Sequence, residues 1–278
     1  MESPQDRVRV VQLESERLKQ YLAALPFESF DRPSAVDGWK IGDVVGHLCF
    51  GSGSYLMFLE RALKGDTSTP EGFWEPGAIS ATAAAKIDSA GSERWARLGD
   101  QLIPTVVENV DRLSQLLGGL SPSDFDRPTY HLVFGIVPIK ATLVWWTTEL
   151  AQHGWDFRSV LEPDTHLSAD SLRIFMAFIP EVVRWSLRRG EKLPKPLRFR
   201  FELTATRNDI VVYGDEARMT PVSDSPADTT IHCDTETFSL LMMGRGRLRW
   251  DAVVAAGRAE VEGDRDLVPR FAQWFPGT

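Results

Sequence analysis

Apolar residues recur at helical spacing through the first half of the chain. The pattern predicts one helix near residues 11–25 and a second over 39–63, because apolar positions there return every three or four residues. The apolar stripe of the second helix consists of Ile41, Val44, Val45, Leu48, Tyr55, Leu56 and Leu59. Gly51 and Gly53 weaken this helix, but they would allow close packing near a crowded site.

Two further helices are predicted before residue 164. One covers residues 92–117, where Pro104 either kinks the helix or marks its true start. The other is opened by Pro138 and closed by Pro163. A loop rich in Gly, Pro and Thr, at residues 65–80, precedes these two helices. Four helices with one long loop predict a four-helix bundle.

The predicted secondary structure changes after residue 164, from helices alone to helices and strands. A linker leads into a helix over residues 171–190, bent at Pro180. Residues 197–206 then alternate between apolar and polar positions, which is the period of a half-buried strand. Further strands are predicted at 209–215, 229–234 and 257–264, with short helices at 235–245 and 266–275. The expected fold class is α+β, with a bundle domain over 1–164 and a smaller α+β domain over 165–278.

The amino-acid composition argues against some classes of binding partner. The chain has 278 residues, 43% of them hydrophobic, and a net charge of −8. Such an acidic protein has no basic footprint for nucleic acid or for an anionic membrane surface. Two cysteines far apart make no disulfide framework. No apolar run reaches the length of a membrane span and no signal-peptide pattern is present, so we expect a cytoplasmic protein.

Two candidate metal ligands lie in the predicted fourth helix. Glu149 and His153 stand four residues apart, so they lie on one face of a helix, one turn apart. Together with His47 from the second helix they would form a three-ligand metal site with a vacant fourth position, as in catalytic zinc sites. The alternatives are a polar pair on a solvated face and a hydrogen-bonded histidine in the core. Bundle cores are common places for such ligand sets, which favours the metal site.

Two stretches carry a resemblance to a known family. "GWKIGDVVGHL" at 38–48 and "ELAQHGWDF" at 149–157 resemble the signatures of the mycothiol-dependent maleylpyruvate isomerase family, a branch of the DinB-like metal-binding four-helix bundles. The first signature has Trp39, Asp43 and His47 in the matching positions, and the second has Glu149 and His153 followed by Gly-Trp-Asp. The resemblance therefore implies His47, Glu149 and His153 as metal ligands.

The resemblance extends to other positions. "GRAEVEGDRDLVPRFAQWF" at 257–275 resembles the end of the sterol-carrier-like domain of these isomerases. The resemblance implies Arg258 as the arginine that anchors the substrate, and the alternative is a surface charge. Arg245, Arg247 and Arg249 are a rival source of positive charge. Trp155 and Asp156 are candidates to line the cofactor pocket, and the alternative for Trp155 is a place in the core. Asp43 would either orient His47 or favour the start of its helix.

The resemblance implies a metal-dependent enzyme that uses mycothiol. Zn²⁺, or another divalent ion such as Ni²⁺, would favour the thiolate form of the thiol. The expected reaction is cis-trans isomerisation of a small unsaturated acid, or thiol transfer to one. The alternatives are a lipid- or small-molecule-binding protein with a structural metal, and a metal-assisted hydrolase. The expected partners are a small-molecule substrate and a low-molecular-weight thiol, with the protein a monomer or a homodimer.

Overall fold

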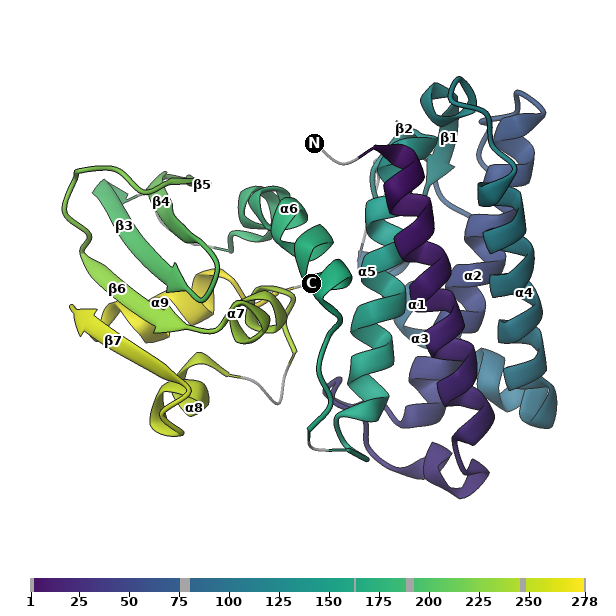
Figure 1. Cartoon of the computed structure of the whole chain (residues 1–278), viewed down its shortest axis with the longest axis horizontal. Helices are drawn as coiled ribbons and strands as arrows, with labels where there is room; N and C mark the ends of the chain where they lie inside the picture. The colour runs from purple at the N-terminus through teal and green to yellow at the C-terminus, as the bar shows by residue number, and fades with distance from the viewer. Residues whose placement is uncertain (1–2, 76–80, 163, 189–192, 246–248, 278) are drawn as a thin grey trace. The chain divides into compact units, whose positions relative to one another are not determined.

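The structure is a computed structural model that describes residues 3–75, 81–162, 164–188, 193–245 and 249–277. The chain divides into two compact units, one comprising Met1–Ser34 with Gly38–Thr165 and the other Ala35–Asp37 with His166–Thr278. The first is helical and the second contains a sheet, which confirms the predicted α+β class (Figure 1). The division into domains at 1–164 and 165–278 stays a prediction. No helix in the described parts is long and apolar enough to cross a membrane.

The first unit is built on a four-helix bundle. Its members are α1 (Pro4–Ala24), α2 (Ile41–Leu63), α4 (Leu102–Gly118) and α5 (Ile139–Arg158). Both α1 and α2 pack against α4 and α5, while α3 (Ala81–Leu98) packs along α2. Short 3₁₀ helices lie at Phe27–Asp31, Gly99–Gln101 and Asp124–Asp126. The predicted bundle is confirmed, and it places α2 directly against α5 (Figure 1).

The single helix predicted over 92–117 is wrong. The chain forms α3 and α4 there, separated by the 3₁₀ turn in which Gly99 has a φ of +49°, a conformation that favours glycine. Pro104 lies in the first turn of α4, where its missing N–H has no helical acceptor to satisfy, so it marks the start of that helix.

A small hairpin before α5 was not predicted. It consists of β1 (Pro128–His131) and β2 (Gly135–Pro138), paired antiparallel. Pro138 is the extended N-cap residue of α5, so it opens that helix as expected. The helix ends at Arg158, before Pro163, which lies outside the described residues. Residues 76–80 of the predicted loop are likewise not described.

A close approach of two helices in this unit is made by glycines other than the predicted ones. A Cβ at Gly51 or Gly53 would meet its nearest neighbouring atom at 3.4 Å, an ordinary van der Waals distance. A Cβ at Gly46 would instead lie 2.0 Å from the carbonyl oxygen of Gly91 on α3. The tight approach of two helix backbones therefore occurs immediately before His47.

The second unit is a five-stranded sheet with helices. Its strand order is β5-β4-β3-β6-β7, and among these pairs only β3 and β6 run parallel. The strands are β3 (Leu193–Leu203), β4 (Arg207–Gly214), β5 (Glu216–Pro221), β6 (Thr229–Cys233) and β7 (Ala259–Gly263). The helices are α6 (Ala169–Ser186), α7 (Thr235–Met242), α8 (Trp250–Ala255) and α9 (Leu267–Trp274). Neither β5 nor α8 was predicted.

The core of the second unit follows the predicted alternation. Leu197, Phe199, Phe201 and Leu203 of β3 are all buried, with partly exposed polar residues between them. The ring of Phe271 on α9 lies 4.9 Å from that of Phe199 and 5.3 Å from that of Phe201. Pro180 sits inside α6 on its exposed side, where a lost backbone hydrogen bond is open to water.

Candidate metal centre

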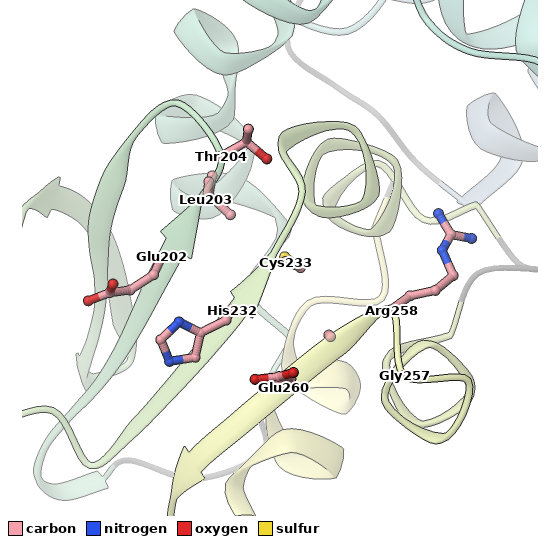
Figure 2. Close-up of a pocket in the computed structure, with 9 residues that line it drawn as sticks. Glu202, Leu203, Thr204, His232, Cys233, Gly257, Arg258 and Glu260 are labelled. Carbon is pink, nitrogen blue, oxygen red and sulfur yellow. The ribbon is translucent and has the colours of Figure 1, made fainter.

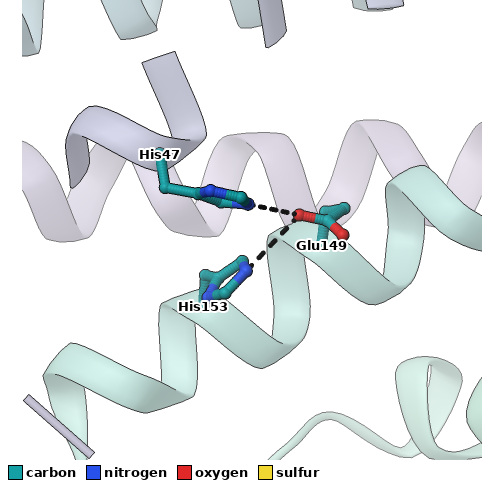
Figure 3. A group of neighbouring side chains, drawn as sticks. All are labelled: His47, Glu149 and His153. Carbon is teal, nitrogen blue, oxygen red and sulfur yellow. Dashed lines mark hydrogen bonds and ion pairs between the residues drawn. The ribbon is translucent and has the colours of Figure 1, made fainter. Parts of the chain in front are cut away.

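Three side chains from two helices converge in the first unit. His47 comes from α2, and Glu149 and His153 come from successive turns of α5. Oε2 of Glu149 lies 3.2 Å from Nε2 of His47 and 3.4 Å from Nε2 of His153 (Figure 3). One ligand-type atom from each residue falls within 4.8 Å of the others. The two imidazoles and the carboxylate thus face one point, as the sequence predicted.

The cluster is enclosed by the bundle and open at the carboxylate. The side chains of His47 and His153 are 11% and 10% exposed, whereas the Glu149 side chain is 29% exposed. Trp39 covers the imidazoles, since its ring stacks on His153 at an interplanar angle of 10° and lies 5.3 Å from His47. A ligand would therefore approach from the side of Glu149.

Asp156 forms a hydrogen bond with the ring nitrogen of His153 that does not face Glu149. It is fully buried, and its Oδ2 accepts a hydrogen bond of 2.8 Å from Nδ1 of His153. A carboxylate only accepts, so the bond fixes a hydrogen on Nδ1 and aims Nε2 at the cluster. This is the arrangement of outer carboxylates behind metal-bound histidines.

The charges of the cluster favour a positive charge among its side chains. Burial raises the pKa of Glu149, but hydrogen bonds from His153 and His47 outweigh it and hold that pKa well below its usual value. Burial lowers the pKa of His153, but hydrogen bonds to Asp156 and Glu149, with their charges, raise it to about 8. A proton on His153 therefore supplies a positive charge between the carboxylates of Glu149 and Asp156. Two imidazole nitrogens and one carboxylate oxygen are also a donor set suited to Zn²⁺ or Ni²⁺, so the residues fit a divalent ion.

Asp43 stabilises the start of α2 and does not orient His47, the other role expected for it. Its carboxylate accepts a 2.8 Å hydrogen bond from the backbone N–H of Lys40, which caps the start of α2. Nδ1 of His47 has no hydrogen-bond partner among the described residues, so Asp43 does not orient that imidazole. Trp155 is 9% exposed and packs within the bundle. A role of Trp155 or Asp156 in binding a cofactor stays a prediction.

A second polar pair, which was not predicted, lies in the same unit. Nε2 of His131 on β1 lies 3.1 Å from the hydroxyl oxygen of Tyr55 on α2. The sequence placed Tyr55 in the apolar stripe and assigned no role to His131. Their separation of 76 residues along the chain carries no periodic signal.

Arg258 lies in the second unit, directly before β7. It lines a cavity of about 460 Å³ together with His232 and Cys233. Figure 2 shows its guanidinium directed away from His232 and Glu260. It donates a 2.8 Å hydrogen bond to Oγ1 of Thr237. Its role as substrate anchor stays a prediction.

The rival arginines are differently placed. Arg245 is only 5% exposed and donates to the carbonyl oxygen of Met243 at 3.0 Å. Arg249 is exposed and pairs with Asp251 at 3.2 Å. Arg247 lies outside the described residues.

Comparison with known proteins gives a family and a fold. Residues 11–158 match the family described as "Mycothiol maleylpyruvate isomerase N-terminal domain". Among solved structures, that of the mycothiol-dependent maleylpyruvate isomerase aligns at 17% identity with a TM-score of 0.61, covering 88% of this chain and 93% of that chain. A mutant of that isomerase, with alanine in place of a histidine, aligns at 16% identity with a TM-score of 0.60 over the same shares. Curated proteins give no match.

A shorter solved structure aligns with part of the chain. The UbiJ-SCP2 ubiquinone synthesis protein is 19% identical and covers 37% of this chain and 90% of its own, with a TM-score of only 0.30. The isomerase structures, with their TM-scores above 0.5 and high coverage, show that the fold of this chain is one already known.

Proposed function

Since the chain belongs to the family of mycothiol maleylpyruvate isomerase N-terminal domains, we propose that it is a metal-dependent enzyme that uses mycothiol. Its substrate would be a small electrophilic or unsaturated acid. The reaction would be thiol-assisted cis-trans isomerisation, or transfer of the thiol to that acid. The observation that carries this proposal is the convergence of His47, Glu149 and His153 on one point.

The chain's own residues supply an environment for a thiol rather than the thiol itself. Cys49 is fully buried, and burial raises its pKa, so it remains a protonated core residue. Burial also raises the pKa of Cys233 in the second unit, to about 12. Neither cysteine is a thiolate near neutral pH, so a nucleophilic sulfur has to come from a small thiol.

Each part of the cluster has a role in this chemistry. A divalent ion, when bound, would favour the thiolate form of a thiol and so make it nucleophilic. His47, Glu149 and His153 would hold that ion, Asp156 would keep Nε2 of His153 aimed at it, and Trp39 would exclude water from the imidazole side. The partly exposed face of Glu149 leaves the approach for thiol and substrate.

Metal content and thiol binding test the proposal together. Gently purified protein should contain about one divalent ion per chain, and calorimetry of the zinc-loaded form should show binding of mycothiol. The His153→Ala variant should lose both the ion and the binding. His166→Ala is the matched control, because His166 is exposed and lies in the second unit. Unchanged metal content in His153→Ala, or no heat with mycothiol, would contradict the proposal.

One observation favours a second candidate, a binding protein for apolar ligands. The second unit has a cavity of about 530 Å³ whose lining includes Leu172, Met176 and Ala205. Cavities of this size hold small molecules. Native mass spectrometry separates the candidates: a co-purified lipid without metal would favour the binding protein. Turnover by the metal-loaded protein without any thiol would favour a hydrolase.

A further inference from the structure

His131 is a buried histidine whose hydrogen position is fixed by its surroundings. It is only 3% exposed. Its Nδ1 lies 3.1 Å from the backbone nitrogen of Val133 and 3.3 Å from that of Phe134. Backbone N–H groups only donate, so Nδ1 is the acceptor of both and carries no hydrogen.

The other ring nitrogen therefore donates to Tyr55. Burial lowers the pKa of His131 to about 4, so the ring is neutral near neutral pH and has one hydrogen. That hydrogen is on Nε2, which lies 3.1 Å from the hydroxyl oxygen of Tyr55. The tyrosine oxygen accepts this bond, and its own hydrogen has to point elsewhere.

The hydroxyl of Tyr55 is a donor without an acceptor among the residues that the structure describes. Burial, followed by the charge of Glu149, raises the pKa of Tyr55 well above its usual value, so the hydroxyl keeps its hydrogen. His131 is its only hydrogen-bond partner within the described parts of the chain. Tyr55 is partly exposed, so its O–H can donate to an acceptor from outside the protein, either a ligand or water.

Tyr55 lies on α2 and its ring contacts α5, the two helices that carry the metal cluster. It follows His47 by eight residues on α2, which is two helical turns and about 80° more, so both residues lie on the same broad side of the helix. Its ring lies 5.0 Å from that of Trp146, three residues before Glu149 on α5. The charge of Glu149 acts on the pKa of Tyr55 and of His131 alike. Tyr55 thus contacts α5 about one helical turn before the carboxylate of the cluster.

We propose that Tyr55 donates a hydrogen bond to the sulfur of a low-molecular-weight thiolate bound beside Glu149, and that His131 holds the hydroxyl in place for it. The inference rests on the proposed function, because it names a residue of that same site. A hydrogen bond to the charged form of a group stabilises that form, so Tyr55 lowers the pKa of the bound thiol. His131 acts through Tyr55 and is a positioning residue.

Substituting cobalt for zinc allows the hydrogen bond between Tyr55 and the thiolate to be tested by absorption spectroscopy, without measuring turnover. A thiolate bound to Co²⁺ gives a charge-transfer absorption, and its dependence on pH reports the pKa of the bound thiol. With mycothiol as the probe, Tyr55→Phe should raise the midpoint of that band by about one pH unit, as expected for a lost hydrogen bond to a charged group. It should also weaken mycothiol binding near neutral pH about tenfold.

Matched variants separate the hydrogen bond from general damage to the bundle. Tyr21→Phe removes a half-buried hydroxyl on α1, where the Tyr21 ring packs 5.5 Å from Phe157, and should leave the band unchanged. His131→Leu should shift the midpoint in the same direction as Tyr55→Phe. His131→Gln should shift it less, because the glutamine amide restores a donor toward Tyr55.

The outcomes distinguish this inference from the proposed function. A cobalt protein that gives no charge-transfer band with mycothiol overturns both. A band that forms in the unaltered protein, with the same midpoint in Tyr55→Phe, overturns the inference alone. Weaker cobalt binding in Tyr55→Phe at an unchanged midpoint also overturns it, since it assigns Tyr55 to holding Glu149.

Discussion

Gly46 of α2 and Gly91 of α3 touch through their backbones. A Cβ on Gly46 would lie 2.0 Å from the carbonyl oxygen of Gly91, and a Cβ on Gly91 would lie 2.3 Å from the carbonyl oxygen of Asp43. Neither obstacle is a flexible side chain, so a methyl group at either position would have to move one helix away from the other. The contact immediately precedes His47, so it also sets where that imidazole stands.

Gly46→Ala should therefore destabilise the bundle and weaken metal binding together. Overpacking of this kind costs about 1–3 kcal/mol, which outweighs the gain of roughly 0.5–1 kcal/mol from replacing a helical glycine. Thermal unfolding and zinc titration measure the two effects. Gly53→Ala is the control on the same helix, where the nearest atom to the new Cβ is the Asn109 side chain at 3.4 Å. Equal melting temperatures for the two variants would contradict the prediction.

Asp156→Asn should weaken metal binding without removing a ligand. Asparagine keeps the shape of the side chain but accepts more weakly from Nδ1 of His153, and loss of such outer partners costs about 10–100-fold in affinity. Competition with a coloured chelator measures the zinc affinity. Asp126→Asn, at an exposed carboxylate paired with Lys140, should leave that affinity unchanged. If both variants bind zinc as tightly as the unaltered protein, Asp156 does not support the site.

The helices were predictable where apolar spacing is regular and uninterrupted. The break between α3 and α4 was not, because Trp95 and Leu102 are seven residues apart and fit one helical stripe even across the 3₁₀ turn. The edge strand β5 also escaped prediction: Ala217 is its only buried residue, so it shows no apolar alternation.

The cluster of His47, Glu149 and His153 was predictable because two of its members share a helix face and the third lies in an apolar stripe. That these side chains converge is a prediction confirmed by their positions, while their role as ligands stays a prediction. The bonds of Asp156 to His153 and of Tyr55 to His131 depend on side-chain rotamers and tertiary packing, and spacing along the chain specifies neither.

Removal of a bound ion should destabilise the first unit. Binding to the folded state alone stabilises it by about 2.7 kcal/mol at a free ligand concentration one hundred times the Kd. Zinc should therefore raise the melting temperature of the unaltered protein, and a chelator should reverse the rise. His153→Ala should show neither change, whereas His166→Ala should show both. A zinc effect of equal size in His153→Ala would place the ion elsewhere.

Asp209 should make the second unit sensitive to acid. It is fully buried on β4, and its carboxylate accepts from Arg198 at 2.7 Å and from Arg200 at 2.9 Å. Burial raises the pKa of Asp209, but the hydrogen bonds from the two arginines outweigh it and hold that pKa below its usual value. A carboxyl group of this kind stabilises the fold above its unfolded pKa of about 3.9, and the stabilisation is lost as the pH falls through the folded pKa.

Asp209→Asn should thus cost on the order of 3 kcal/mol near neutral pH, because it leaves two arginines without their shared carboxylate. The difference from the unaltered protein should shrink below a pH of about 4, where the aspartate itself becomes protonated. Urea unfolding at a series of pH values measures both quantities. Asp251→Asn removes an exposed partner of Arg249 and should change stability little at any pH. A destabilisation by Asp209→Asn that stays constant from neutral to acid pH would show that its charge is not what stabilises the sheet.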